Sequence, residues 1–399
     1  MSQGSMRWPA ASPLPDNDDM LREILIHLPP LPSSLPRASL VCKHWRRLLS
    51  DPRFLRRFRA LNHQNPTLLG FFDDIDGPYF TPTLDPPDRI PSARLSLPHP
   101  RAERWSFLGC RHGLALLLNE TRLEFTVWDP VTGDQRRVVL PPELFSSGDG
   151  KTVLSGALLC GDDHYAGRAP LEAFKVVVLW SDDNFLVDDD TQLYASLYQS
   201  ETGVWRDLIS ASIAIPLELL VPSVLIGNSL YWLLLRYENH GNGGILELDL
   251  DKQSLAVRYP FGAHTTRNSC MWIVRMEDAG LGFAIASDLS YSIQLWERKT
   301  NSNDRAGWML QKTIELDKLL PPRSPEPTSR TFIHGYDEDG DVIFISTDLQ
   351  VYMIQLKSLQ FSNLSTTNFV SIYYPYRSLY ASGRCIGSGD VEVGTLSNA

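Results

Sequence analysis

The sequence predicts a small all-α domain at the N-terminus and, after it, an all-β domain that forms a β-propeller of six blades. Residues 14–60 carry apolar side chains at helical spacing, interrupted by prolines and capping residues. From Thr67 onward, short apolar or alternating runs return about every ten residues, with turn residues between them. A hairpin-ended unit repeats along this second part, which favours a propeller over the alternative, a pair of β-sandwiches.

The first helix is predicted from the apolar residues that follow the acidic cluster near the N-terminus. Leu21, Ile24, Leu25 and Leu28 are spaced three, four and seven residues from the first of them, so they share one helix face. Pro29-Pro30 ends the helix, because proline supplies no backbone donor and restricts the residue before it.

Two further helix starts are expected downstream. Ser34 is the expected N-cap of the next helix, with Pro36 tolerated in its first turn. Asp51-Pro52 is typical of another start, with aspartate as the cap and proline at the first helical position. Phe54 and Phe58 in this last helix are expected to lie in the core.

The helical unit carries more apolar surface than its size explains. A unit of about 50 residues buries only a modest fraction of its surface and is marginally stable alone. This one contains more than a dozen large apolar side chains. Part of that surface is therefore expected to be buried by a partner or by the second domain.

The order of these residues resembles an F-box, most closely that of the large group of plant F-box proteins. The resemblance covers about 45 residues and rests on Leu14-Pro15, Asp19, Glu23-Ile24-Leu25, Leu28-Pro29, the run Ala38 to Arg46 with its Cys-Lys-x-Trp-Arg step, and Asp51-Pro52-Arg53-Phe54. His27 departs from the family, which often has arginine there.

Membership of that family would imply binding to a Skp1-type adaptor and, through it, to a cullin-1-type scaffold. The resemblance places the docking surface or its support on ten residues: Leu14, Pro15, Ile24, Leu25, Leu28, Pro29, Leu40, Val41, Cys42 and Trp45.

The blades are predicted from a recurring hairpin in the β-rich part. Its turns are placed at positions 72, 50, 46 and 60 residues apart, which fits four-stranded blades with loop insertions: Asp129, Glu201, Asp251, Glu297 and Lys357. Inner turns are expected at 110–113, 227–228 and 337–341. Five blades are counted between about 105 and 366, and strands near 67–83 and 370–380 are expected to complete a sixth from both ends. This part resembles the kelch-like propeller that follows the F-box in many plant F-box proteins.

The predicted domain organisation has four parts. Residues 1–12 form a disordered tail, 13–62 the helical F-box domain, 66–385 the propeller-like target-binding domain and 386–399 a flexible tail.

The charge of the chain is acidic overall and unevenly distributed. The net charge is −10, but residues 1–65 hold ten Lys and Arg against five Asp and Glu. The overall balance argues against general affinity for nucleic acid. The basic N-terminal part indicates either an acidic partner or solvated helix faces.

Cysteine usage and hydropathy indicate the cellular compartment of the protein. The five cysteines are scattered and contain no CxxC pair, which favours a reducing compartment and excludes a disulfide framework or a zinc site. The N-terminus lacks the apolar region of a signal peptide. The most apolar run, 219–235, is interrupted by Pro222, Gly227 and Asn228, so no membrane span is predicted. A cytoplasmic or nuclear protein is expected.

No catalytic motif occurs at a useful spacing in the sequence, and no cofactor or metal is expected. The best residues for a propeller active site are His112, Asp162, Asp163, His164 and His334, each of which is expected instead to be a turn or strand-end residue. The acidic runs at 74–76, 182–183 and 188–190 lack the remaining ligands of a calcium loop.

The expected function is that of a non-catalytic substrate-recognition subunit of a Skp1–cullin–F-box ubiquitin ligase, with an unidentified protein target on the β domain. Specificity is expected in the long loops at 84–104, 181–191, 298–307 and 320–328. The alternatives are a propeller hydrolase with a helical prefix and a scaffold that binds the adaptor without delivering a target.

Overall fold

The computed structural model describes residues 17–62, 66–74, 78–97, 103–141, 151–160, 170–181, 191–213, 219–235, 244–258, 269–287, 290–300, 306–321, 330–347, 350–364 and 372–379. The chain divides into two compact units, one containing the N-terminal helices up to Thr67 and the other running from Leu68 to Ser378. The predicted tails, 1–12 and 386–399, lie outside the described residues. Within the described residues, no helix is long and apolar enough to cross a membrane.

The N-terminal unit consists of four short helices around one apolar core. They are α1 (Asn17–Ile26), α2 (Ser34–Ser39), α3 (Lys43–Leu49) and α4 (Pro52–Asn62). Leu25, Leu49 and Phe58 lie at the centre of the core, and Phe54 is buried beside them as predicted.

Two helix starts in this unit, those of α3 and α4, have side-chain caps. The carboxylate of Asp51 accepts a 2.9 Å hydrogen bond from the backbone N–H of Arg53, as the Asp-Pro step predicts. The Sγ atom of Cys42 accepts from the N–H of Trp45 at the start of α3. The expected cap at Ser34 is wrong: Ser34 is already helical, and Ser33 before it makes no side-chain capping bond. Ser33 has helical backbone angles, whereas a capping side chain needs an extended backbone.

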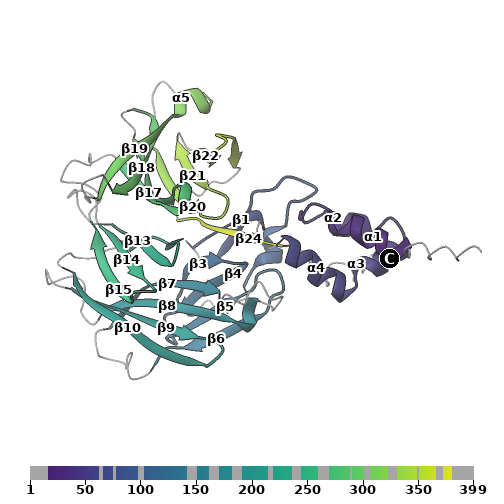
Figure 1. The fold of residues 1–399 in the computed structure, drawn as a ribbon, viewed down its shortest axis with the longest axis horizontal. Coiled ribbons are helices and arrows are strands. Elements are labelled where there is room, and N and C mark those ends of the chain that lie inside the picture. The colour runs from purple at the N-terminus through teal and green to yellow at the C-terminus, as the bar shows by residue number, and fades with distance from the viewer. Residues whose placement is uncertain are drawn as a thin grey trace, which may run out of the picture. The chain divides into compact units, whose positions relative to one another are not determined.

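The second unit is a six-bladed β-propeller (Figure 1). Its described strands form six antiparallel sheets. Three of them follow one another in the first half of the unit: β3 (Trp105–Arg111), β4 (Leu114–Asn119), β5 (Glu124–Trp128) and β6 (Gln135–Val139); β7 (Thr152–Cys160), β8 (Phe174–Ser181), β9 (Thr191–Gln199) and β10 (Val204–Ile213); and β11 (Leu219–Leu220), β12 (Val224–Ile226), β13 (Ser229–Leu235), β14 (Ile245–Asp249) and β15 (Ser254–Arg258).

The remaining sheets complete the ring. They are β16 (Ser269–Arg275), β17 (Leu281–Ser287), β18 (Ser292–Thr300) and β19 (Ala306–Glu315), followed by the short helix α5 (Leu316–Leu319); β20 (Phe332–Asp337), β21 (Val342–Thr347), β22 (Gln350–Gln355) and β23 (Phe361–Leu364); and the closing blade, in which β24 (Tyr374–Ser378) and β2 (Tyr79–Pro82) flank β1 (Thr67–Asp73).

The innermost strands form a closed circuit. β24 contacts β3, β3 contacts β7, the third blade follows through β11 and β12, and β16 contacts β20, which returns to β24. The sixth blade is therefore assembled from both ends of the β-rich part, as predicted. Closure removes the open sheet edges that a linear array would leave, and it excludes the pair of β-sandwiches.

Burial follows the position of a strand within its blade. Every residue of β4 and of β21 is buried, because both faces of these strands are covered by neighbouring blades. In the outer strand β6 only Val138 is buried. The continuous apolar runs in the sequence thus mark the strands near the centre of the ring.

Four of the five predicted hairpin turns are confirmed and one is wrong. Asp129, Glu201, Asp251 and Lys357 each lie within two residues of the end of a third strand, in the connection to the next strand. Glu297 instead lies inside β18, opposite Met309 of β19. The paired strands of this blade continue to Thr300 and Ala306, so the turn comes after Thr300.

Candidate docking surface and channel pocket

The N-terminal unit exposes large apolar side chains on consecutive helices. Ile24 on α1 is 64% exposed, and Leu40 and Val41 between α2 and α3 are 75% and 62% exposed. Met20, one helical turn before Ile24, and Leu31 are exposed as well. We call these five residues the apolar surface. A unit with a complete core of its own has no structural need for it.

The structure distributes the ten predicted docking residues over three environments. Ile24, Pro29, Leu40, Val41 and Cys42 are exposed, Leu28 and Trp45 are half-buried, and Leu25 is buried in the core. Leu14 and Pro15 lie outside the described residues. The exposed members can contact a partner directly, whereas Leu25 can only support them. Sequence reasoning missed Met20 and Leu31, although the four-residue spacing between Met20 and Ile24 could have indicated the first.

Ion pairs link helices of this unit to one another. The guanidinium of Arg57 on α4 donates to both carboxylate oxygens of Glu23 on α1, and the hydrogen bond from Arg57 lowers the pKa of Glu23. Nε2 of His44 on α3 lies 2.7 Å from a carboxylate oxygen of Asp18 on α1. These contacts link α1 to α3 and α4, the last two helices of this unit.

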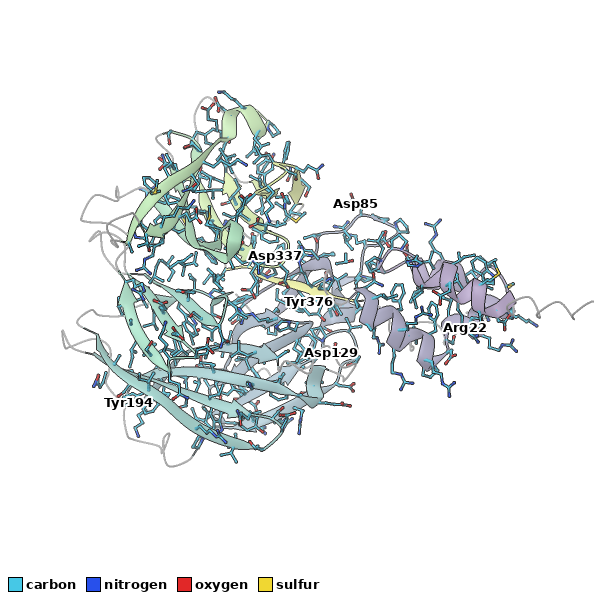
Figure 2. All side chains as sticks on the ribbon, viewed as in Figure 1. Arg22, Asp85, Asp129, Tyr194, Asp337 and Tyr376 are labelled. Carbon is cyan, nitrogen blue, oxygen red and sulfur yellow. The ribbon has the colours of Figure 1, made fainter. Side chains whose placement is uncertain are left out.

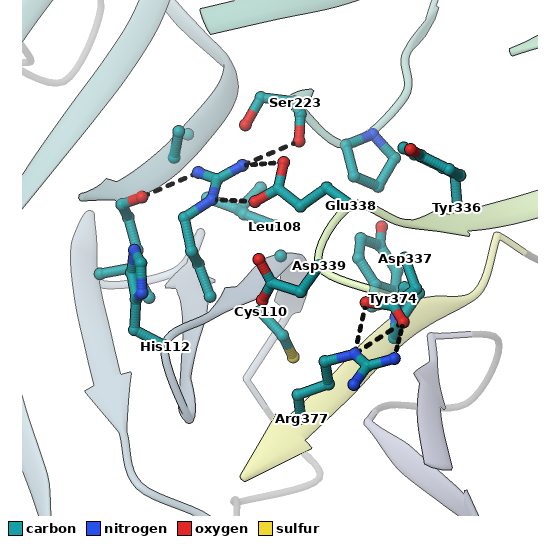
Figure 3. A pocket seen from close by; sticks show the side chains of 17 residues that line it. Leu108, Cys110, His112, Ser223, Tyr336, Asp337, Glu338, Asp339, Tyr374 and Arg377 are labelled. Carbon is teal, nitrogen blue, oxygen red and sulfur yellow. Dashed lines mark hydrogen bonds and ion pairs between the residues drawn. The ribbon is translucent and has the colours of Figure 1, made fainter. Parts of the chain in front are cut away.

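The second unit contains a small polar pocket at the centre of the ring (Figure 3). Its volume is about 60 Å³. The innermost strands β3, β7, β20 and β24 contribute to its wall, together with Pro222 and Ser223, where the inner strand of the third blade is interrupted. Two arginines and three consecutive acidic residues gather here, so the pocket is dominated by charge.

The first ion pair of the pocket joins Arg111 to Glu338. Nε and Nη2 of Arg111 donate to the two carboxylate oxygens of Glu338 at 2.5 and 3.2 Å. Arg111 also donates to the carbonyls of Leu158 at 2.8 Å and Ser223 at 3.1 Å. The arginine side chain is 6% exposed. Burial opposes the ionised form of Glu338, but Arg111 and the N–H of Leu225 outweigh it, and the pKa of Glu338 is lowered.

The second ion pair joins Arg377 of β24 to Asp337 of β20. Nε of Arg377 lies 2.9 and 2.7 Å from the two carboxylate oxygens, and Nη2 lies 2.6 Å from Oδ2. Asp337 is buried, and this burial raises its pKa despite the arginine. Gly340 packs directly on the pair, with room for no Cβ atom. Figure 2 shows Asp337 and Tyr376 inside the propeller.

Asp339 is the third acidic residue and has no such partner. No hydrogen bond or ion pair reaches its carboxylate from the described residues, and its side chain is exposed to the pocket. Loss of hydration and the repulsion from Glu338 and Asp337 outweigh the attraction of Arg377 and Arg111, so the pKa of Asp339 is raised. In Figure 3 it lies between the two ion pairs.

The predicted catalytic candidates do not converge. His112 lies in the β3–β4 turn at the rim of the pocket, with a positive φ of 55°. His334 is buried in β20, where its ring stacks on Tyr373 and Nε2 lies 2.7 Å from Oγ of Ser346. Asp162, Asp163 and His164 lie outside the described residues. Across the described ranges, no group of three or more His, Cys, Asp and Glu is arranged to hold a metal ion.

Two family profiles match this chain and together cover most of it. The profile of the F-box domain matches residues 17–57, and that of the "F-box protein AT5G49610-like, beta-propeller" matches residues 106–374. The chain belongs to this family of F-box propeller proteins. The helical unit is thus an F-box and the ring its family propeller.

The chain is also similar to a curated relative and to solved structures. The chain is 23% identical over 233 residues to "Putative F-box protein At3g17480" of Arabidopsis thaliana, and the match covers 55% of each chain. It therefore spans about half the length of that relative. An oligogalacturonate lyase in complex with manganese is 10% identical, with a TM-score of 0.42 over 73% of this chain and 72% of the other. An oligogalacturonate lyase from Vibrio parahaemolyticus is 9% identical, with a TM-score of 0.36 over 63% and 62% of the two chains.

Proposed function

We propose that this F-box protein is the substrate-recognition subunit of a Skp1–cullin–F-box ubiquitin ligase. Its F-box would dock on a Skp1-type adaptor, and through it on a cullin-1-type scaffold, while the propeller holds a target protein. Such a subunit would work in the cytoplasm or the nucleus. The observation that carries this proposal is the apolar surface of an F-box whose own core is already complete.

The apolar surface has the character of a binding site. A standard interface buries about 800 Å² on each partner, and a few central side chains carry most of the binding energy. Ile24 on α1 and Leu40 and Val41 between α2 and α3 are large and exposed. The Glu23–Arg57 ion pair links α1, which carries Ile24, to α4.

Catalysis in this assembly requires no bond-making residue in the chain. A target held near a charged ubiquitin carrier reacts at high effective concentration. The channel pocket supports recognition over hydrolysis, because Asp337 and Glu338 are engaged by arginines and cannot serve as free acid or base. F-box proteins of this kind are generally non-catalytic. A scaffold role differs only in the fate of the target, which is measured by target stability in cells.

The test is capture of the full-length protein by a purified Skp1-type adaptor. Ile24→Asp/Val41→Asp places charge on the apolar surface without removing a core side chain, and we expect it to weaken capture by about tenfold or more. Val139→Asp, at an exposed valine of β6, is the matched control and should bind as the wild type does. Equal capture of all three, or failure of the folded wild type to bind, would refute adaptor docking. Circular dichroism establishes that each variant is folded.

A further inference from the structure

We propose that the channel pocket binds one basic side chain, a lysine or arginine of the target protein, with Asp339 as its counter-ion. This inference rests on the proposed role of the propeller in holding a target. It specifies the chemistry that the target must present.

One carboxylate of the pocket has no hydrogen-bonded arginine among the described residues. Asp337 and Glu338 are each matched by an arginine that contacts both of their carboxylate oxygens. Asp339 follows them directly, and no described side chain is paired with it. The repulsion from its two acidic neighbours that raises its pKa would be offset by a bound cation.

The same contacts exclude an anion as the ligand. The buried guanidinium of Arg111 already donates to Glu338 and to two backbone carbonyls. Arg377 is committed to Asp337 through Nε and Nη2. An incoming phosphate or carboxylate would have to displace these bonds and would meet the charge of Asp339.

The size of the pocket indicates the tip of a side chain and not a metabolite. Ligand pockets for small molecules usually measure several hundred Å³, whereas this one has about 60 Å³. A water needs about 10–15 Å³ of such volume, so the pocket has room for a few waters, which an ammonium or guanidinium group can replace. Leu108, Pro222 and Pro375 add apolar wall for the aliphatic stem of such a side chain.

The pocket is also preorganised. Arg111 anchors Glu338 and Arg377 anchors Asp337 to neighbouring blades. Asp339 directly follows these two residues, so its backbone is positioned before a cation enters, which lowers the entropic cost of binding.

The test measures the fluorescence anisotropy of short fluorescein-labelled peptides mixed with the full chain. Four peptide pools are compared, with a fixed central Lys, Arg, Gln or Glu and all other positions randomised. We expect the Lys or Arg pool to bind about tenfold more tightly than the Gln pool, as one charge-assisted hydrogen bond allows. Asp339→Asn should abolish this preference. Asp134→Asn, at an exposed carboxylate in the β5–β6 turn, should retain it.

Two results would overturn the proposal. One is the absence of a Lys or Arg preference in the wild type, or its persistence in Asp339→Asn. The other is saturable binding of Mg²⁺, measured by calorimetric titration, that is lost in Asp339→Asn while the peptide pools show no preference. This result would assign the site to a metal ion. Adaptor capture of Asp339→Asn is measured in parallel. Absence of the peptide preference in the wild type, with normal adaptor capture, refutes only this inference, whereas failure of the folded wild type to be captured refutes the proposed function.

Discussion

Arg111 and Glu338 form a doubly hydrogen-bonded ion pair although 227 positions separate them in the sequence. Arg111 ends the inner strand β3, and Glu338 directly follows β20, so the pair connects the two blades on either side of the closing strand β24. Glu338 also accepts from the N–H of Leu225 in β12 at 2.8 Å. One carboxylate thus links three blades at the centre of the ring.

Removal of one partner of this pair should destabilise the propeller strongly. Arg111→Met leaves the carboxylate of Glu338 with a single backbone donor, and breaking a buried pair in this way costs about 3–5 kcal/mol. Urea denaturation measures the change in the free energy of unfolding. Arg22→Met, which breaks the exposed pair with Asp19, should cost less than about 1 kcal/mol. The prediction fails if the two variants lose similar amounts.

A methyl group at Gly340 should disrupt the second ion pair. The Cβ of Gly340→Ala would lie 1.7 Å from Nη2 of Arg377 and 2.5 Å from Oδ2 of Asp337. The guanidinium has to leave its buried partner, and we expect a loss of roughly 1–3 kcal/mol. Thermal unfolding compares it with Gly307→Ala, where a Cβ meets nothing within 4 Å. Equal melting temperatures would contradict the prediction.

Closure of the ring should depend on the aromatic residues of β24. Tyr376 is fully buried, its ring lies 5.5 Å from that of Phe72, and its hydroxyl donates to the carbonyl of Gly113 at 3.1 Å. Tyr376→Ala should cost about 3–5 kcal/mol, and Tyr376→Phe, which removes only the hydrogen bond, about 1 kcal/mol. Chemical denaturation separates the two contributions. Tyr79→Ala, at an exposed tyrosine of β2, is the control.

The ionised carboxylate of Asp339 should lower the stability of the fold at neutral pH. Because its pKa is raised in the folded state, ionisation destabilises the fold above that pKa, and the penalty disappears as the pH falls below the ordinary value of 3.8. Asp339→Asn is therefore expected to be more stable at pH 7, by up to about 1 kcal/mol after solvent screening. The gain should vanish near pH 3. A variant less stable than the wild type at pH 7 would argue against an uncompensated charge.

Local sequence signals located most elements correctly. The spacing of Leu21, Ile24, Leu25 and Leu28 gave the first helix, and Asp51-Pro52 gave the start of α4. The strands on both sides of the β-rich part were correctly joined into the closing blade. The apolar surface was predicted in part, because exposed anchors such as Ile24 and Val41 belong to a contiguous motif.

The sequence by itself determined the helical unit, the all-β unit and the number of blades, because periodicity, caps and turn residues act over a few neighbouring positions. Only the tertiary structure decided which charged residues pair in the channel pocket. Asp337, Glu338 and Asp339 look alike in the sequence, yet one pairs with Arg377, one with Arg111 and one with no described side chain. Which carboxylate pairs with which arginine depends on how the closed ring brings distant inner strands together. Local sequence signals do not specify such long-range contacts.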